Sequence, residues 1–207
     1  IVGADGETHQ GIYDISFLRI LPKIVLMTPS NELEMWKMLS TGYKHKGLAA
    51  VRYPRGYSQG EDINLDHSTI EIGKAKIIQK GKKIAYLVFG TLLNIVKKVA
   101  KKNGATLVDM RFVKPLDEGM VIDICNTHDY IFTVEDNVIL GGAGTAVNEV
   151  MAKYSLKNNL VIIGVPDKVI PHGSQDEILS ELGLDELGIE KITNDHVHNM
   201  VEMTNKK

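Results

Sequence analysis

Two short loops in this chain combine charge, backbone freedom and a titratable ring. The first, "GADGETHQG" at residues 3–11, carries the carboxylate of Asp5 and the imidazole of His9 between glycines. Imidazole exchanges protons near neutral pH, so this composition is typical of a loop that takes part in proton transfer. The second loop, "VRYPRG" at residues 51–56, carries Arg55 just before its last residue. A guanidinium there can donate two parallel hydrogen bonds to a phosphate or a carboxylate.

The same residues also fit a structural interpretation. Glycine-rich polar loops are common on protein surfaces, and Asp5 and Arg55 carry opposite charges. A salt bridge between these two side chains would fix the loops to each other without any ligand. Spacing alone does not separate the two interpretations.

Other motifs are weaker candidates. "GGAG" at residues 141–144 opens a helix, so its amides could hold an anion, but it lacks the dinucleotide fingerprint and a P-loop lysine, and we favour a tight turn. His196 and His198 have no third ligand at metal spacing, and we expect a solvated helix end. His172 precedes a predicted Ser174 helix cap and is interpreted as a loop residue. The chain therefore predicts no metal site of its own.

Composition excludes several functional classes. The 207 residues have a formal net charge of -2, which is not the basic excess of a protein that binds nucleic acid or anionic membranes. The apolar runs are too short to cross a bilayer, and the start shows no signal-peptide pattern. We therefore expect a soluble, cytoplasmic protein. The single cysteine, Cys125, is expected to be a buried structural thiol.

A βαβ unit is predicted around the two loops. Residues 23–29 and 48–56 are short apolar runs typical of strands, and Ser30 or Asn31 can cap a helix between them. Ligand sites of parallel sheets lie beyond the carboxyl ends of the strands. Arg55, just past its strand, is therefore expected to reach the crevice beside the first loop.

A second, more regular series follows a polar stretch at 57–67, which we interpret as a surface linker. Alternating strands and helices are typical of an α/β fold, in which crossover helices cover both faces of a mainly parallel sheet. The predicted strands are 83–90, 105–113, 130–137 and 160–167; the predicted helices are 92–102, 117–128, 144–155 and 174–183. The last of these forms a final helical pair with a polar tail from about Leu187.

Five stretches together carry a family resemblance over nearly the whole chain: "GADGETHQGIYDISFLRILPKIVLMTPSNELEM", "AAVRYPRG", "ATLVDMRFVKPLDE", "VEDNVILGGAGTAVNEV" and "IPHGSQDEILSELGLD". In this order they resemble the 1-deoxy-D-xylulose-5-phosphate synthases, a family of thiamine diphosphate enzymes in the transketolase superfamily. The resemblance implies that residues 1–67 are the C-terminal part of a pyrimidine-binding domain with a linker. Residues 68–207 would be a transketolase C-terminal-like α/β domain with a mainly parallel five-stranded sheet.

The resemblance also implies what is missing. The pyrophosphate-binding domain, the magnesium motif and the start of the pyrimidine-binding domain have no counterpart in these residues. We therefore expect a fragment that is inactive alone, with most ligands of thiamine diphosphate and Mg²⁺ in the missing upstream part. Of the catalytic residues, the family pattern matches His9, which would lie over the reactive carbon of the cofactor, and Asp5 beside it. Arg55 matches a ligand of the aldehyde's phosphate, whereas Arg52 is interpreted as structural.

For the complete enzyme, the resemblance implies a decarboxylative condensation of pyruvate with glyceraldehyde 3-phosphate, which supplies isoprenoid, thiamine and pyridoxal precursors. A homodimer is expected as the assembly. Two alternatives remain: another transketolase-like subunit, such as a 2-oxoacid dehydrogenase β subunit, and a stand-alone binding module without catalysis. The pairing of "THQG" and "YPRG" with "VDMRFVKPLDE" disfavours the first, and folding of the chain without thiamine dependence would favour the second.

Overall fold

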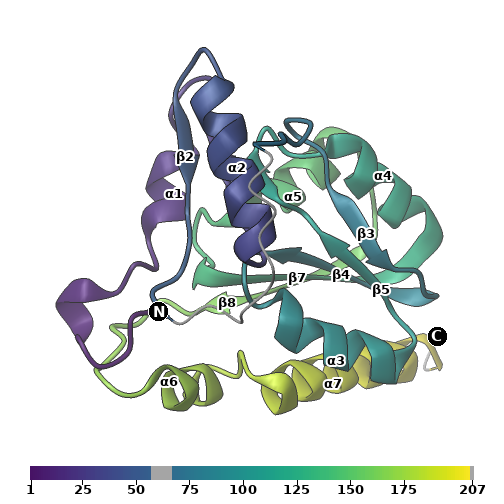
Figure 1. Ribbon diagram of the computed structural model, residues 1–207. Coiled ribbons are helices and arrows are strands. Elements are labelled where there is room, and N and C mark those ends of the chain that lie inside the picture. The colour runs from purple at the N-terminus through teal and green to yellow at the C-terminus, as the bar shows by residue number, and fades with distance from the viewer. Residues whose placement is uncertain (57–66, 206–207) are drawn as a thin grey trace.

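The larger of two sheets forms the centre of the molecule in the computed structural model, which describes residues 1–56 and 67–205. Its strand order is β3-β5-β4-β7-β8 (Figure 1). The antiparallel edge strand β3 pairs with β5, and the other pairs are parallel. The strands are β3 (Lys76–Gln79), β4 (Lys83–Phe89), β5 (Thr106–Asp109), β7 (His128–Val138) and β8 (Asn159–Val165). This confirms the predicted α/β class and the mainly parallel five-stranded sheet.

Helices cover both faces of this sheet because successive side chains of each strand point to opposite sides. On β4, Tyr86 and Val88 face α3 and α7, while Ala85 and Leu87 face α4 and α5. The helices are α3 (Leu93–Asn103), α4 (Glu118–Thr127), α5 (Ala143–Lys153), α6 (Gln175–Glu181) and α7 (Glu186–Asn205). The apolar face predicted at residues 92–100 is buried, and the tail predicted as polar forms α7.

The smaller sheet has the order β2-β1-β6, in which β6 is Phe112–Lys114, and includes the predicted βαβ unit. β1 (Val25–Met27) and β2 (Ala49–Val51) are parallel, and α2 (Glu32–Lys44) connects them. Of the two predicted caps, Asn31 is the one used, since its side chain accepts a hydrogen bond from the amide of Glu34. Two short helical segments, η1 (Glu7–His9) and α1 (Asp14–Leu18), precede β1 and were not predicted. The predicted linker at 57–67 lies outside the described residues, apart from His67.

The prediction of one strand at 105–113 is wrong, because this segment changes sheets. It forms β5 and then β6 (Phe112–Lys114), which pairs antiparallel with β1. Between them Arg111 adopts a positive φ of 58°, and the Asp109 carboxylate accepts a hydrogen bond from its amide at 3.1 Å. The second oxygen of Asp109 accepts a 2.6 Å hydrogen bond from Ser30 Oγ, in the loop that follows β1 of the smaller sheet. The turn therefore joins the two sheets.

A buried carboxylate holds the start of α5 against β7. Glu135 accepts hydrogen bonds from the amides of Ala143 at 2.7 Å and Gly144 at 2.8 Å. A Cβ atom on Gly142 would lie 2.5 Å from this carboxylate, and one on Gly144 would lie 2.4 Å from Thr133 Oγ1. The glycines of "GGAG" therefore let helix and strand approach, which confirms the tight-turn interpretation. Burial raises the pKa of Glu135 to about 7, although the two amides act in the opposite direction.

No helix in the described part of the chain is long and apolar enough to span a membrane.

We predict that the larger sheet is the more stable unit. It is covered by helices on both faces, whereas the smaller sheet has three short strands within the described residues. Native-state amide exchange of the 207-residue chain should be slowest in β4, β5 and β7 and faster in β1 and β2. Slower exchange in β1 and β2 than in β4 and β7 would contradict this ranking.

A second prediction concerns Glu135. Its pKa is raised in the folded state to about 7, so its contribution to stability is fully present below the unfolded pKa of about 4.5 and declines as pH rises through about 7. Glu135→Gln removes this titration. In urea unfolding at pH 5, 6, 7 and 8, the free energy of unfolding of the original chain relative to the variant should therefore fall as pH rises. The exposed Glu181→Gln is the control, and a pH-independent difference for Glu135→Gln would contradict the prediction.

Candidate active site

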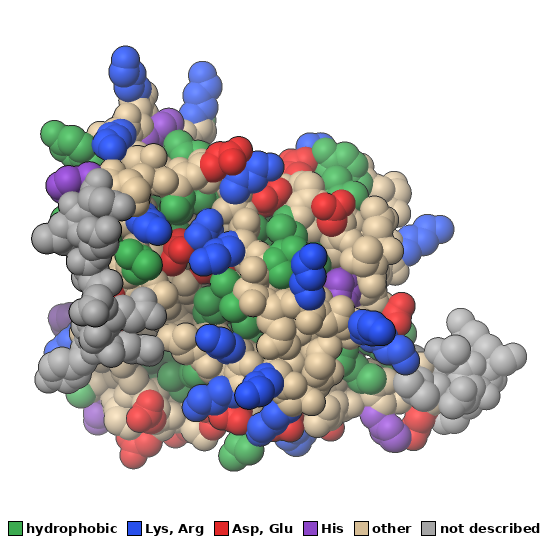
Figure 2. Space-filling view, turned by 45° about the vertical axis from the view of Figure 1, so that its right-hand side comes forward, with side chains coloured by type: hydrophobic (Ala, Val, Ile, Leu, Met, Phe, Trp, Pro, Cys, Tyr) green, Lys and Arg blue, Asp and Glu red, His purple; other side chains and the backbone are tan. Residues whose placement is uncertain are grey.

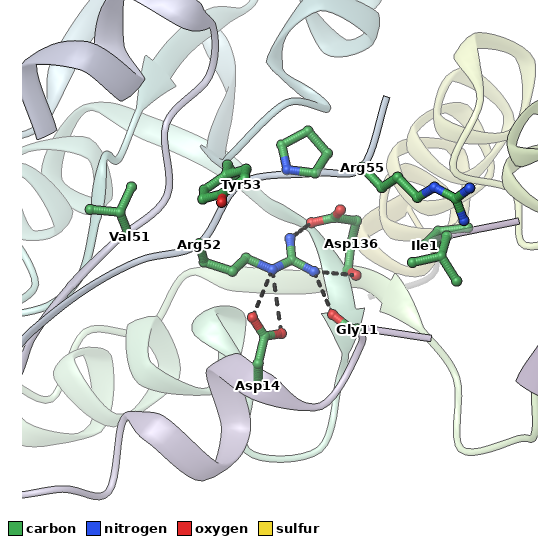
Figure 3. Close-up of a pocket in the computed structure, with 10 residues that line it drawn as sticks. Ile1, Gly11, Asp14, Val51, Arg52, Tyr53, Arg55 and Asp136 are labelled. Atoms are coloured by element: carbon green, nitrogen blue, oxygen red, sulfur yellow. Dashed lines mark hydrogen bonds and ion pairs between the residues drawn. The ribbon is translucent and has the colours of Figure 1, made fainter. Parts of the chain in front are cut away.

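Arg52 lies at the centre of a buried polar network between the two sheets (Figure 3). Its Nε donates to both carboxylate oxygens of Asp14, at 3.3 and 3.1 Å, and its Nη1 pairs with Asp136. Its Nη2 donates to the carbonyl oxygens of Gly11 at 2.8 Å and Asp136 at 3.3 Å. Arg52, in the second loop, therefore connects that loop to the end of the first loop and to β7.

The opposite charges of Arg52 and Asp136 stabilise each other's ionised forms. Burial on its own would raise the pKa of the Asp136 carboxyl, but the adjacent Arg52 guanidinium lowers it below its ordinary value. Burial likewise disfavours the charge of Arg52, while Asp136 and Asp14 raise its pKa. The pair is thus ionised. This contact set agrees with the structural role that the sequence indicates for Arg52.

Asp136 is one of three consecutive buried polar residues at the carboxyl end of β7. Glu135 holds α5, as described above, and Asn137 accepts a hydrogen bond from the amide of Ile15 at 3.2 Å and donates to Ser16 Oγ at 3.0 Å. The sequence predicted this stretch as a strand without assigning a role to these side chains. Together they attach α5, Arg52 and α1 to the end of one strand.

Asp5 and Arg55 form an ion pair between the two loops. Both side chains are exposed, by 40% and 59%, so water screens their attraction and the pair contributes little to stability. The structural alternative considered for these residues is therefore present in the molecule. The described pair uses only Nη1 of Arg55, and the guanidinium has further donors that can bind a ligand.

His9 ends the short helical turn η1 on the same loop, with its ring exposed. Thr8 Oγ1 lies 3.0 Å from its Nδ1, so Nε2 is the ring atom open to a ligand. Among the described contacts, none joins His9 to Asp5 or Arg55. The structure thus brings Asp5 and Arg55 together and places His9 four residues farther along the loop of Asp5.

A cavity of about 250 Å³ opens beside Arg52 and Arg55. Ile1, Tyr53 and Asp136 contribute to its walls. In Figure 3 the side chain of Arg55 extends away from the Arg52 network. The two arginines of the second loop therefore have different surroundings: carboxylates enclose Arg52, whereas Arg55 points outward.

The start of α6 and the segment before it contact both loops. Gln175 Nε2 donates to the carbonyl oxygens of Ile1 at 2.7 Å and Arg55 at 2.8 Å. Gln10 Nε2 of the first loop lies 3.5 Å from the carbonyl oxygen of Pro171. The predicted cap at Ser174 is confirmed, because its side chain accepts from the amide of Glu177 in a capping box. Sequence reasoning missed Gln175, since a glutamine at a helix start carries no signal of its own.

The other sequence candidates have partners within the chain. The "GGAG" amides are occupied by Glu135. The ring of His196 lies edge-on to Phe132, and His198 lies 3.1 Å from Glu202 on α7. Cys125 is buried, which raises the pKa of its thiol to about 11 and makes it a poor nucleophile.

Comparison with known proteins gives two family matches. The family model "Transketolase, C-terminal domain" matches residues 73–189, and "Transketolase, pyrimidine binding domain" matches residues 1–59. The chain is 49% identical over 197 residues to 1-deoxy-D-xylulose-5-phosphate synthase of Vibrio campbellii and 52% identical over 197 residues to that of Idiomarina loihiensis. Each alignment covers 95% of this chain and 32% of the relative, so the chain spans about a third of their length.

Solved structures agree in fold. A split gene transketolase, described as an inactive beta4 tetramer, superposes with a TM-score of 0.80 at 22% identity and covers 91% of this chain and 62% of its own. The transketolase of Campylobacter jejuni superposes with a TM-score of 0.67 at 15% identity and covers 94% and 29%. At these identities the likeness shows the fold alone. Since the C-terminal domain match covers more than half of the residues, the chain belongs to the transketolase family.

Proposed function

We propose that this chain forms part of a 1-deoxy-D-xylulose-5-phosphate synthase, a transferase that condenses pyruvate with glyceraldehyde 3-phosphate and releases carbon dioxide. This proposal rests on sequence identities of 49% and 52% to two curated synthases, each over 95% of the chain. The product would supply isoprenoid, thiamine and pyridoxal precursors. Because the chain spans 32% of those relatives, we propose that the remaining parts of the site come from sequence outside it.

Thiamine diphosphate and Mg²⁺ are the cofactors of the proposed reaction. We propose that the residues that would hold Mg²⁺ lie in sequence outside this chain, since within residues 1–56 and 67–205 no group of three or more His, Cys, Asp or Glu side chains is placed to hold a metal ion. For thiamine diphosphate the chain offers one flank, the exposed polar loop with Asp5 and His9. When bound, the cofactor supplies a nucleophilic carbon and an electron sink. This chain's residues would supply orientation and proton transfer.

His9 is the proposed group for proton transfer. Its Nδ1 is engaged by Thr8, and its exposed Nε2 can donate a proton to an oxygen that gains negative charge, or remove one. Asp5, four residues earlier, would orient the Arg55 guanidinium through the ion pair that they form. Its position at the loop surface also lets it act on charge at the cofactor.

Arg55 is the proposed ligand of the aldehyde's phosphate. It is exposed by 59% and extends outward from the second loop, and the described ion pair with Asp5 uses only its Nη1. A phosphate that accepts two of the guanidinium N–H groups would be fixed in position as well as in distance.

The wider assignments are further proposals. We propose the division at residue 67 between the pyrimidine-binding and C-terminal domains, a homodimer for the complete enzyme and a cytoplasmic location. We expect no nucleic-acid partner. The face in Figure 2 has Lys and Arg side chains spread over it with acidic ones between them, and the formal net charge is -2.

The role of Arg55 predicts a selective defect in the complete enzyme. Arg55→Ala should lower kcat/KM for glyceraldehyde 3-phosphate about thirty- to a hundredfold, because a charge-assisted contact worth roughly 2–3 kcal/mol is lost. Decarboxylation of pyruvate and use of an unphosphorylated aldehyde should change little. Single-turnover kinetics with both aldehydes measures this difference. Lys153→Ala is the control, since Lys153 and Glu118 form an ion pair of nearly equal exposure, 58% and 39%, away from the loops.

His9→Ala should slow the chemical steps with both aldehydes, since proton transfer at the cofactor does not depend on the acceptor's phosphate.

Equal losses for both aldehydes in Arg55→Ala, together with a lower melting temperature, would show that Arg55 only fixes the loops. Absence of any pyruvate-dependent condensation by the complete unmodified enzyme would refute the proposed function itself.

A further inference from the structure

Gln175 is the first residue of α6, and its amide group connects two loops that are distant in sequence. The Nε2 atom donates to the carbonyl oxygen of Ile1, before the first loop, at 2.7 Å. It also donates to the carbonyl oxygen of Arg55, in the second loop, at 2.8 Å. One primary amide has two N–H donors, so these two bonds use its full donor capacity. No other part of the site binds the backbone of Arg55 in the described contacts.

The position of Gln175 is fixed from the larger sheet. Ser174 and Glu177 form a reciprocal capping box that determines where α6 begins. One turn along, Ile178 is 2% exposed and packs in the core that β4 and β7 share with α3. The side chain of Gln175 therefore starts from a rigid point of the C-terminal region.

The first loop rests on the same segment. Gly3 has a positive φ of 75°, and a Cβ atom there would lie 3.0 Å from the carbonyl oxygen of Gly173 and 3.1 Å from the amide of Gln175. At Gly6 a Cβ atom would lie 3.3 Å from Cβ of His172. In Figure 1 the N-terminal segment accordingly runs beside the chain that leads into α6. The backbone of both loops thus lies in contact with residues 172–175.

We propose that Gln175 is a positioning residue that sets the separation between the Asp5 and His9 loop and the Arg55 loop. This inference rests on the proposed function, in which these two loops hold the cofactor side and the phosphate side of one reaction. The Asp5–Arg55 ion pair is exposed and screened by water, so it does not define that separation alone. Arg52 holds the end of the first loop at Gly11, and the two backbone hydrogen bonds from Gln175 fix the start of that loop relative to Arg55. Misplacement of a reacting group by about 1 Å is costly for catalysis.

The first test uses the 207-residue chain and needs no activity. Gln175→Met keeps the size of the side chain and removes its donors. Amide exchange in the segments 3–11 and 52–56 should accelerate about three- to tenfold, as expected for the loss of two hydrogen bonds, while exchange in β7 stays unchanged. Gln79→Met is the matched control, because Gln79 Nε2 also donates to two carbonyl oxygens, those of Ala100 at 3.1 Å and Ala105 at 2.8 Å, outside the two loops. Unchanged exchange in both loops of Gln175→Met would overturn the proposal.

The second test separates positioning from general stability in the complete enzyme. Gln175→Met should raise KM for glyceraldehyde 3-phosphate about three- to tenfold while kcat for pyruvate decarboxylation changes less than about twofold. Gln79→Met should leave both constants unchanged. If Gln175→Met instead changes kcat and KM by similar factors for all substrates and lowers the melting temperature, the role of Gln175 is merely structural. That result would overturn the proposal. If the unmodified enzyme shows no condensation, the proposed function fails, and amide exchange alone then decides the role of Gln175.

Discussion

The Arg52 guanidinium is enclosed by the carboxylates of Asp14 and Asp136 and by the carbonyl oxygen of Gly11. A charge buried in this way is tolerated only when its partners are in place, and removal of one partner from a buried pair costs about 3–5 kcal/mol. Asp136 belongs to β7, whereas Arg52 follows β2 of the smaller sheet. The two sheets therefore have one arrangement in which this charge is satisfied. The loops on either side of Arg52 are placed by that arrangement.

Several other contacts depend on the same junction. Asn137 and Glu135, which flank Asp136, hold α1 and α5, and Asp109 with Ser30 joins the sheets at the turn between β5 and β6. The side chains enclosed at the junction are thus polar but paired. Those left exposed, Asp5, His9 and Arg55, lie on the loops just outside it. A rigid junction that carries short exposed loops is a common way to build a site for polar ligands.

The sequence predicted most of the architecture because periodicity is a local property. The apolar runs at β1, β4, β7 and β8, and the caps at Asn31 and Ser174, could be identified from neighbouring residues alone. The change of sheet at Arg111 could not, because "TLVDMRFV" has the composition of one continuous strand. β3 was missed for the opposite reason: "KIIQ" is short, and lysines flank it.

The site was predictable only in part. Asp5, His9 and Arg55 could be identified as candidates by residue type and by the resemblance, and the structure brings Asp5 and Arg55 into contact. The partners that hold the loops were not predictable, because Asp136 lies 84 residues from Arg52 and Gln175 lies 120 residues from Arg55. Arg52 and Asp136 couple the two sheets, and a double-mutant cycle tests this by urea unfolding of the chain with Arg52→Met, Asp136→Asn and both changes. We predict a coupling free energy above about 1.5 kcal/mol, so that the double variant loses much less than the sum of the single ones; additivity within about 0.5 kcal/mol would contradict this coupling.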